Sequence, residues 1–331
     1  MSLVETQERR PRVSVVVPNF NGIQHLPECL ACLSSQSFDD LEVVMVDNAS
    51  TDESVAWVQE HHPEVRIIQR AFNGGPVIST NDGIQASRGE YVVLLDNDTA
   101  FDRDWLGILV RALDEHPEYD YGVSMILLYG EDDLLQSAGE IYKISRLCSA
   151  SRGSGRPAAA YSQMQRVVAA AGNGAIHRRE IFDDVGLYDE DYYAIHEDID
   201  FSLRCLIRGK RCLYVPDARI RHKVGLCRES SHEAQMTFLR NASMMAAKNL
   251  PMPLLALGIL SIGWQEFRST VPLRPQYYRF LPQTFRESRA RTRARWEGLR
   301  MGWAKRRSVW RSRRNSRREI YRWLLRGAGP V

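Results

Sequence analysis

The stretch YVVLLDNDTAF, residues 91–101, decides how this chain folds. Its unbroken apolar run, residues 91–95, predicts a strand buried on both faces, the kind found inside a parallel sheet. The run leads straight into Asp96, Asn97 and Asp98. Two acids one residue apart at a strand end can present their oxygens to a hard divalent cation such as Mg²⁺ or Mn²⁺. Acidic turns after strands are common, however, so the pair carries weight only with support from the rest of the sequence.

The N-terminal half alternates between strand and helix patterns, which indicates an α/β fold. Apolar strands and helical spacings are predicted in the order strand 13–17, helix 26–36, strand 41–47, helix 51–62, strand 64–70 and helix 77–87. Such βαβ units predict a mostly parallel sheet flanked by helices. Ligands bind beyond the carboxyl ends of these strands, so Asp47 and the later acidic pair should share a crevice. The segment 149–163, rich in Ser, Gly, Arg and Pro, is expected to be a mobile loop.

Length and composition suit one large domain with an appendage. The 331 residues are 44% apolar, enough for a sizeable core. We expect a first domain over residues 1–245 and a helical, Arg-rich extension over residues 246–331. The longest apolar run, residues 250–264, contains two prolines and is too short to span a membrane comfortably, so an interfacial or core helix is expected there.

Two further features indicate a cytoplasmic protein. The first residues, MSLVETQERRPR, lack the basic-then-apolar pattern of a secretory signal. Six cysteines are present, and Cys29 and Cys32 form a lone C-x-x-C within a predicted helix. With no second pair nearby, reduced packing cysteines are the simpler interpretation than a zinc or redox site.

The acidic pair belongs to an ordered set of motifs: PNFNG (18–22), VDNASTD (46–52), NGG and NDG (73–75, 81–83), DNDT (96–99) and HEDID (196–200). In this order the set resembles glycosyltransferase family 2, over about residues 12–245. The segment 174–209 is most similar to the rhamnosyltransferase-like branch. The resemblance implies a GT-A (Rossmann-like) fold and metal-dependent, inverting transfer from a nucleoside-diphosphate sugar. The donor would be UDP- or dTDP-linked, with dTDP-rhamnose one candidate. The acceptor would be a hydroxyl of a saccharide or lipid-linked molecule, in polysaccharide biosynthesis of the cell envelope.

The resemblance also implies site residues. It assigns the nucleotide-sugar site to Pro18, Asn19, Phe20, Asn21, Asp47, Asn48, Ser50, Asn73, Gly74, Gly75, Asp96 and Asn97. Asp47 matches the acid that accepts a hydrogen bond from the base, and glycines at 74–75 let the backbone approach the nucleotide. Asp98 resembles the direct metal ligand and Asp96 the acid that contacts ribose or water. His222 matches a third ligand of some relatives, or is an ordinary histidine at a strand end.

The HEDID motif supplies the expected catalytic base. Inverting transfer needs a group that takes the proton of the acceptor hydroxyl, and Asp198 matches the family's base. Its neighbours Glu197 and Asp200 are expected to point elsewhere. Acids at a helix N-terminus also stabilise the helix through its dipole, which is the alternative interpretation. An inactive GT-A scaffold is a further alternative, and the intact acids argue against it. A sugar nucleotidyltransferase would need a glycine-rich loop with Arg and Lys after the first strand, which PNFNGIQHLPE lacks.

The C-terminal extension is strongly basic. Residues 286–326 contain sixteen Lys and Arg against three Glu, a net +13, so the rest of the chain carries −10. Trp296, Leu299, Trp303 and Trp310 are predicted on one helical face. A basic helix with tryptophans suits an anionic membrane surface, which would place the protein peripherally at the inner face of the membrane. Packing on the acidic body is the alternative. Since no nucleic-acid-binding module accompanies the arginines, no nucleic acid partner is expected.

Overall fold

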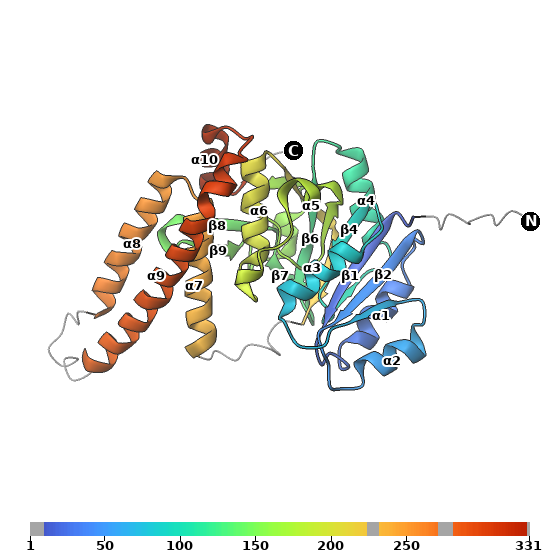
Figure 1. Ribbon diagram of the computed structural model, residues 1–331. Helices are drawn as coiled ribbons and strands as arrows, with labels where there is room; N and C mark the ends of the chain where they lie inside the picture. Colours follow the sequence, from blue (N-terminus) through green and yellow to red (C-terminus); the bar gives the residue numbers. More distant parts are fainter. Residues whose placement is uncertain (1–9, 224–231, 271–280, 330–331) are drawn as a thin grey trace, which may run out of the picture.

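The computed structural model describes residues 10–223, 232–270 and 281–329 (Figure 1). The first elements are β1 (Val13–Asn19), α1 (Leu26–Ser34), β2 (Leu41–Asp47), α2 (Ser54–His61), β3 (Arg66–Gln69), α3 (Pro76–Ala86), β4 (Tyr91–Leu94), β5 (Thr99–Phe101), α4 (Trp105–Glu115), β6 (Tyr121–Leu128), β7 (Glu131–Ser137), β8 (Glu140–Lys143) and β9 (Cys148–Ser151). They are followed by β10 (Gln165–Val167), β11 (Ala175–Arg178), α5 (Glu180–Val185), α6 (Glu197–Arg208), β12 (Cys212–His222), α7 (His232–Asn249), α8 (Met252–Thr270), α9 (Leu281–Arg311), α10 (Arg317–Arg326) and β13 (Ala328–Gly329).

One mixed sheet organises the described residues. Its strand order is β13-β10-β12-β6-β11-β4-β1-β2-β3, with β5 also paired to β12 and β7 to β6. The strands β3, β2, β1 and β4 run parallel to one another, as the alternating pattern predicted. Strand β11 lies antiparallel between β4 and β6, whereas β6 and β12 are again parallel. The prediction of a mostly parallel sheet flanked by helices is therefore confirmed.

The sheet separates two hydrophobic cores. Side chains alternate between the faces of a strand, so Val15 and Val17 of β1 join the core that includes Leu30 of α1 and Leu109 of α4, whereas Val16 joins the core on the other face. That second core receives residues from α3, α5, α6 and α7. Burial on both faces explains why β1 and β4 are continuous apolar runs in the sequence.

The segment 149–163 is more ordered than its composition suggested. Strand β9 pairs with β8, and a 3₁₀ helix follows at Ala158–Tyr161. The Arg152 guanidinium donates to the Ala138 carbonyl at 2.9 Å and to Gln165 Oε1 at 2.5 Å. The expectation of a loop was wrong for residues 149–151 and 158–161, because backbone pairing and one arginine supply contacts that a count of Ser and Gly residues does not reveal.

The C-terminal helices pack on the body of the molecule (Figure 1). Helix α9 lies so close to α7 that a Cβ on Gly298 or Gly302 would lie 1.9 or 2.1 Å from the carbonyl oxygen of Arg240 or Met244. Helix α10 buries an apolar side in the second core, and β13 pairs with β10 at the edge of the sheet. None of the helices in the described ranges combines the length and apolar character needed to cross a membrane.

The apolar face predicted for residues 296–310 is divided in the structure. Trp296 and Trp303 are exposed, whereas Leu299 and Trp310 pack against the second core. The Trp310 indole donates to the Lys248 carbonyl at 3.2 Å. Helix α9 therefore packs on the body and still presents two tryptophans to solvent.

Candidate active site

Strand ends bring the N-terminal motifs together. In the register of β1 and β2, Asn19 lies opposite Asp47. Strand β4 ends at Leu94, opposite Val16, so the chain leaves the sheet while β1 continues. The turn that follows folds against the end of β1, where Asn97 Nδ2 donates to Asn19 Oδ1 at 2.7 Å.

Three side chains form a cluster that could hold a metal ion. Strand β5 pairs antiparallel with β12, and this register places His222 opposite Thr99, directly beside Asp98. His222 Nε2 lies 3.1 Å from Asp98 Oδ1 and 3.9 Å from Asp96 Oδ2. One ligand atom from each of the three residues lies within 4.8 Å of the others. Two carboxylates and an imidazole are a donor set that fits Mn²⁺ or Mg²⁺.

A neighbouring strand orients the imidazole. His222 Nδ1 lies 2.9 Å from Gln136 Oε1, on β7. When Nδ1 carries the proton and donates to Gln136, the Nε2 lone pair faces the two carboxylates. This arrangement is the usual one for a metal-binding histidine, whose second nitrogen is held by an outer hydrogen bond. The donor set therefore fits the metal site implied by the sequence.

Negative charge accumulates at this cluster. Asp96 keeps 54% of its side-chain exposure, yet desolvation by the crevice wall and the charges of Asp98 and Asp198 raise its pKa to about 6 against the opposing effect of His222. Burial lowers the pKa of His222, but its hydrogen bond to Asp98 and the charge of Asp96 raise that pKa by more. Both shifts indicate acids that are held close together and that a bound cation would stabilise in their charged form.

The cluster opens into a crevice of about 230 Å³. Its wall combines the end of β1, the start of α3, the acidic turn and the start of α6: Pro18, Pro76, Thr80, Leu94, Leu95, Asp96, Asn97, Asp98, Gly172, Tyr188, Glu197 and His222. The crevice thus lies at the carboxyl ends of the parallel strands, where the sequence placed it.

Asp47 is buried at the end of β2 and already has several partners. Its Oδ1 accepts from Asn19 Nδ2 at 3.1 Å and from Ser50 Oγ at 2.5 Å, and its Oδ2 accepts from the Ser50 amide at 3.0 Å. Asn21, with a φ of 49°, accepts the Thr51 amide at 2.8 Å through Oδ1. These bonds fix the two loops against each other.

The third predicted loop is joined to the second by paired asparagines. Asn48 Nδ2 donates to Asn73 Oδ1 at 2.8 Å, and Asn48 Oδ1 accepts the Gly74 amide at 3.0 Å. Gly75 has a φ of 88°, and a Cβ there would lie 2.6 Å from the Tyr193 ring. The glycine is therefore required both by its backbone conformation and by its neighbour. Phe20, from the first loop, is exposed beside this network.

Asp198 lies in the first turn of α6. Its Oδ2 accepts the Gly172 amide at 2.8 Å and its Oδ1 accepts the Ile199 amide at 2.7 Å. Burial raises the pKa of Asp198, and the hydrogen bonds from Ile199 and Gly172 lower it, with a net increase. The carboxylate is thus held rigidly beside Gly172, which lines the crevice.

The two neighbouring acids behave differently from each other. Glu197 lines the crevice, so the expectation that it points elsewhere was wrong. Burial and the charge of Asp198 raise the pKa of Glu197. Asp200 does point elsewhere, into the core, with no exposed surface. Glu197 is the first residue of α6 and faces the crevice, whereas Asp200 belongs to the side of the same helix that packs in the core.

A strained turn precedes Asp198. Tyr193, Ile195 and His196 all have positive φ, at 57°, 72° and 73°. Residues other than glycine in this region cost about 1–3 kcal/mol each. Asn241, a fully buried residue of α7, donates through Nδ2 to the carbonyls of Tyr192 at 3.1 Å, Ala194 at 2.7 Å and Ile195 at 3.0 Å. Helix α7 therefore holds the turn that positions the acids.

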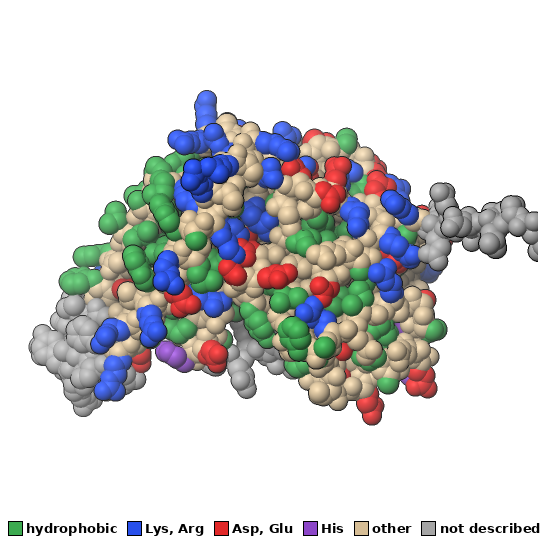
Figure 2. All heavy atoms as spheres, viewed as in Figure 1, with side chains coloured by type: hydrophobic (Ala, Val, Ile, Leu, Met, Phe, Trp, Pro, Cys, Tyr) green, Lys and Arg blue, Asp and Glu red, His purple; other side chains and the backbone are tan. Residues whose placement is uncertain are grey.

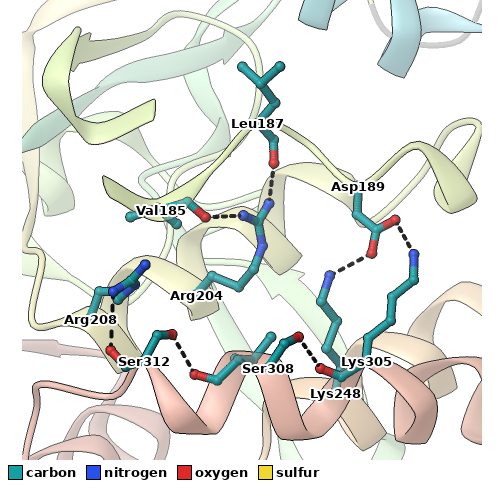
Figure 3. A pocket seen from close by; sticks show the side chains of 10 residues that line it. Val185, Leu187, Asp189, Arg204, Arg208, Lys248, Lys305, Ser308 and Ser312 are labelled. Carbon is teal, nitrogen blue, oxygen red and sulfur yellow. Dashed lines mark hydrogen bonds and ion pairs between the residues drawn. The ribbon is translucent and has the colours of Figure 1, made fainter. Parts of the chain in front are cut away.

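A buried ionic network attaches α6 to the C-terminal helices. Asp200 accepts hydrogen bonds from Tyr192, Arg204, Lys248 and Asn249. Burial raises the pKa of Asp200, but the charges of Lys248 and Arg204 lower it by more, so that the pKa falls to about 2. Figure 3 shows Lys248 and Lys305 converging on Asp189, at 2.7 and 2.6 Å. In the same view Arg204 donates to the carbonyls of Val185 and Leu187. Helix α9 thus contributes to the support of the site.

Three supporting residues were not found from the sequence. Asn173 accepts the Asp96 amide at 3.1 Å and donates to Thr99 Oγ1 at 2.8 Å. Its position between two glycines was the only available signal. Gln136 and Asn241 gave no signal, because a single polar residue in a strand or helix is more often on the surface.

Comparison with known proteins agrees with this geometry. Residues 14–186 match the model of glycosyl transferase family 2. The uncharacterized glycosyltransferase YwdF of Bacillus subtilis is 27% identical over 211 residues, which are 63% of this chain and 73% of that protein. In two other curated relatives the matched part is only 15% and 41% of the relative's length.

Two solved structures share the GT-A fold. Residues 1–349 of S. aureus TarS, in complex with UDP-GlcNAc, superpose with a TM-score of 0.55 at 18% identity, covering 91% of both chains. The mannosyltransferase PcManGT of Pyrobaculum calidifontis, in complex with GDP-Man and Mn²⁺, gives a TM-score of 0.54 at 18% identity, covering 96% of this chain and 88% of that one. At these identities the likeness shows the fold.

Proposed function

The chain is a member of glycosyl transferase family 2, and from this premise we propose that it transfers a sugar from a nucleoside-diphosphate sugar to an acceptor hydroxyl with inversion at the anomeric carbon. One observation carries the proposal. The Asp96, Asp98 and His222 cluster and the first turn of α6 form parts of one crevice at the carboxyl ends of the parallel strands.

Asp96, Asp98 and His222 would hold Mg²⁺ or Mn²⁺. When bound, such a cation neutralises the diphosphate of the donor and stabilises it as a leaving group. Support comes from the orientation of His222 by Gln136 and from the fold likeness to PcManGT, whose structure holds GDP-Man and Mn²⁺.

The nucleotide would lie across the ends of β1, β2 and β3, against the hydrogen-bonded loops at 18–21, 47–50 and 73–75. These loops are fixed by side-chain bonds such as those between Asn48 and Asn73, so little ordering would accompany binding. We propose a UDP- or dTDP-linked donor, with dTDP-rhamnose one candidate. Structures that share the fold hold UDP-GlcNAc in one case and GDP-Man in another, so the likeness supports a sugar nucleotide without selecting its base.

Asp198 would act as the base. As the acceptor oxygen forms a bond to the anomeric carbon, the bond from that carbon to the diphosphate oxygen breaks, and the acceptor proton moves to Asp198. A carboxylate whose pKa is raised by burial is a better proton acceptor than an exposed one. The two backbone amides on Asp198 fix its direction.

The acceptor would be a saccharide or lipid-linked hydroxyl, and the protein would work as a peripheral protein at the cytoplasmic face of the membrane. The net charge of +13 over residues 286–326 supports an anionic surface nearby. The described cysteines are all free, which suits a reducing compartment.

A donor panel tests the proposal. UDP-, dTDP- and GDP-sugars would be screened by thermal shift with and without Mn²⁺, and release of nucleoside diphosphate measured with the best donor. We expect metal-dependent binding of one class, abolished by Asp98→Ala while the fold is kept, and full activity in chelator would disprove the metal role. Failure of every sugar nucleotide to bind or be hydrolysed would disprove the transferase assignment.

A further inference from the structure

Helix α8 presents an uncharged side to solvent. No charged residue occurs from Met252 to Gln265. The inner side of the helix contributes Leu254, Leu255 and Ile262 to the core. The outer side exposes large apolar groups: Met252, Leu257, Ile259, Leu260, Trp264 and Phe267. Leu260 and Trp264 are 71% and 61% exposed. Figure 2 shows hydrophobic side chains gathered over α8, and a patch of this kind marks an interaction site.

Helix α9 adds a basic and aromatic stripe beside this patch. Six exposed residues follow one another at intervals of four and three: Arg289, Arg293, Trp296, Arg300, Trp303 and Arg307. This spacing places them on one side of the helix. Within the described ranges, none of the four arginines has an acidic partner, whereas Arg291, on another side, is paired with Glu266 at 2.7 Å. The stripe therefore has charge available for an anionic partner.

An apolar groove joins the two helices. It has a volume of about 400 Å³ and is lined by Ala247, Met252, Leu255, Ala256, Ile259, Trp296, Leu299, Arg300 and Trp303. Arg300 is its one charged lining residue. The exposed tryptophans of the stripe stand at its edge, so the patch on α8 and the stripe on α9 form one continuous surface, here called the α8–α9 face.

We propose that the α8–α9 face docks the protein on an anionic phospholipid surface. Helix α8 would lie in the plane of the interface with its apolar side at the boundary between headgroups and acyl chains. Trp296 and Trp303 would lie at the headgroup level, where aromatic residues are favoured. The four unpaired arginines would contact lipid phosphates. The inference gives a surface to the peripheral location proposed above and does not depend on the identity of the transfer reaction.

Charge favours lipid over other occupants of this face. A symmetric dimer formed through it would bring the same patch of two copies together, and would bury the arginines of the stripe either against one another or against the uncharged side of α8, in both cases at an energetic cost. A nucleic acid would satisfy the arginines but leave Leu260, Trp264 and Phe267 exposed. Only a surface with anionic headgroups above an apolar interior matches both halves of the face.

Vesicle co-sedimentation of the full chain tests the proposal. The probes are vesicles of phosphatidylcholine alone and vesicles with 30 mol% phosphatidylglycerol, without donor or acceptor, at about 0.1 and 0.5 M NaCl. We expect binding to the anionic vesicles at low salt and at least about tenfold weaker partitioning at high salt or to phosphatidylcholine. Tryptophan quenching by brominated lipid should accompany binding, since three of the exposed large apolar residues are Trp264, Trp296 and Trp303.

Paired variants separate the two halves of the face. Leu260→Glu/Trp264→Glu and Arg300→Glu/Arg307→Glu should each reduce partitioning at least about tenfold. Leu325→Glu, at an exposed apolar residue of α10, and Arg111→Glu, at an exposed arginine of α4, are the matched controls and should bind like wild type. Donor binding should remain in all four variants, which shows that they are folded.

Three results would overturn the proposal. The first is a wild-type protein that does not bind anionic vesicles. The second is equal vesicle binding by the face variants and their controls. The third is a stable wild-type dimer, seen by light scattering, that Leu260→Glu/Trp264→Glu converts to monomer, because the face would then be a contact between copies. A wild-type protein that binds no sugar nucleotide would count against the proposed function, but the measurements of vesicle binding and of oligomeric state would still test the α8–α9 face.

Discussion

Replacing Asn241 by alanine should lower kcat, although Asn241 does not line the crevice. The Asn241 amide has two N–H groups and serves three carbonyls of the turn before Asp198. Losing two buried hydrogen bonds removes about 2 kcal/mol, at a net value of about 1 kcal/mol each. Three left-handed residues store about 3 kcal/mol or more. The free energy of the Asn241 hydrogen bonds is therefore comparable to the backbone strain of the turn, and the turn is expected to relax once these bonds are removed.

The assay compares stability, donor binding and turnover. We expect Asn241→Ala to lose about 2 kcal/mol of unfolding free energy in urea. A shift of the carboxylate by about 1 Å lowers a rate by about 10²-fold, so kcat should fall by that order. The donor Kd should change less than kcat, because the loops at 18–21 and 47–50 are held by their own hydrogen bonds and the turn meets the loop at 73–75 through the contact of Tyr193 with Gly75. Asn241→Asp keeps the shape but turns an oxygen toward the three carbonyls, and should be at least as impaired.

A destabilised control separates positioning from general loss of stability. Leu109→Ala removes a buried side chain of α4, in the core on the opposite face of the sheet, and should cost about 2–5 kcal/mol while kcat stays within about twofold of wild type. A folded Asn241→Ala protein with wild-type kcat would refute the reasoning. So would an equal fall in kcat for Leu109→Ala.

Three further perturbations probe other parts of the structure. Asp198→Asn should keep donor binding and lower transfer by about 10²–10⁴-fold, and wild-type rates would remove Asp198 from the mechanism. Burial lowers the pKa of His177 to about 4, below its usual 6.5, so the unfolded chain takes up the proton first as pH falls and stability drops between pH 6.5 and 4. At pH 5 the folded protein loses about 2 kcal/mol of unfolding free energy through His177. Urea midpoints measured at pH 7.5 and pH 5 should therefore differ less in His177→Phe than in wild type. An equal difference in the two proteins would mean that other groups cause the loss. A Cβ on Gly22 would lie 2.2 Å from both Asn19 Oδ1 and Asn97 Nδ2. Gly22→Ala should therefore break the hydrogen bond between Asn97 and Asn19 and weaken nucleotide binding by about tenfold or more. An unchanged affinity in calorimetry would contradict this.

The parts of the site predicted from sequence are those defined by local pattern. A buried run such as 91–95 must end where the sheet ends, so the position of Asp96 and Asp98 follows from hydrophobicity alone. The βαβ units predict parallel strands, whose carboxyl ends share one edge of the sheet, and this placed Asp47 with the acidic pair. The loops at 18–21 and 73–75 were assigned to the same site by the family resemblance.

The parts that escaped prediction depend on contacts between distant residues. Gln136 reaches His222 across 86 positions, and no local pattern marks such a partner. The turn before Glu197 and Asp198 contains left-handed residues and is held by Asn241, which lies 46 positions after Ile195. The division of Trp296 from Leu299 arises because α9 packs on α7 through glycines on one side only, a constraint that helical spacing alone does not contain.

The edge strand β13 has a consequence for the order of folding. It pairs with β10, so Val167 meets Ala328, a partner 161 positions later in the chain. Until residues 317–329 have been synthesised, β10 has an unpaired edge and the core lacks Ile320, Trp323 and Leu324. Contacts of such long sequence separation form slowly, and an open sheet edge invites pairing with other chains. During synthesis the GT-A core should therefore depend on chaperones until α10 has been made, and shortened forms that end before residue 317 should aggregate.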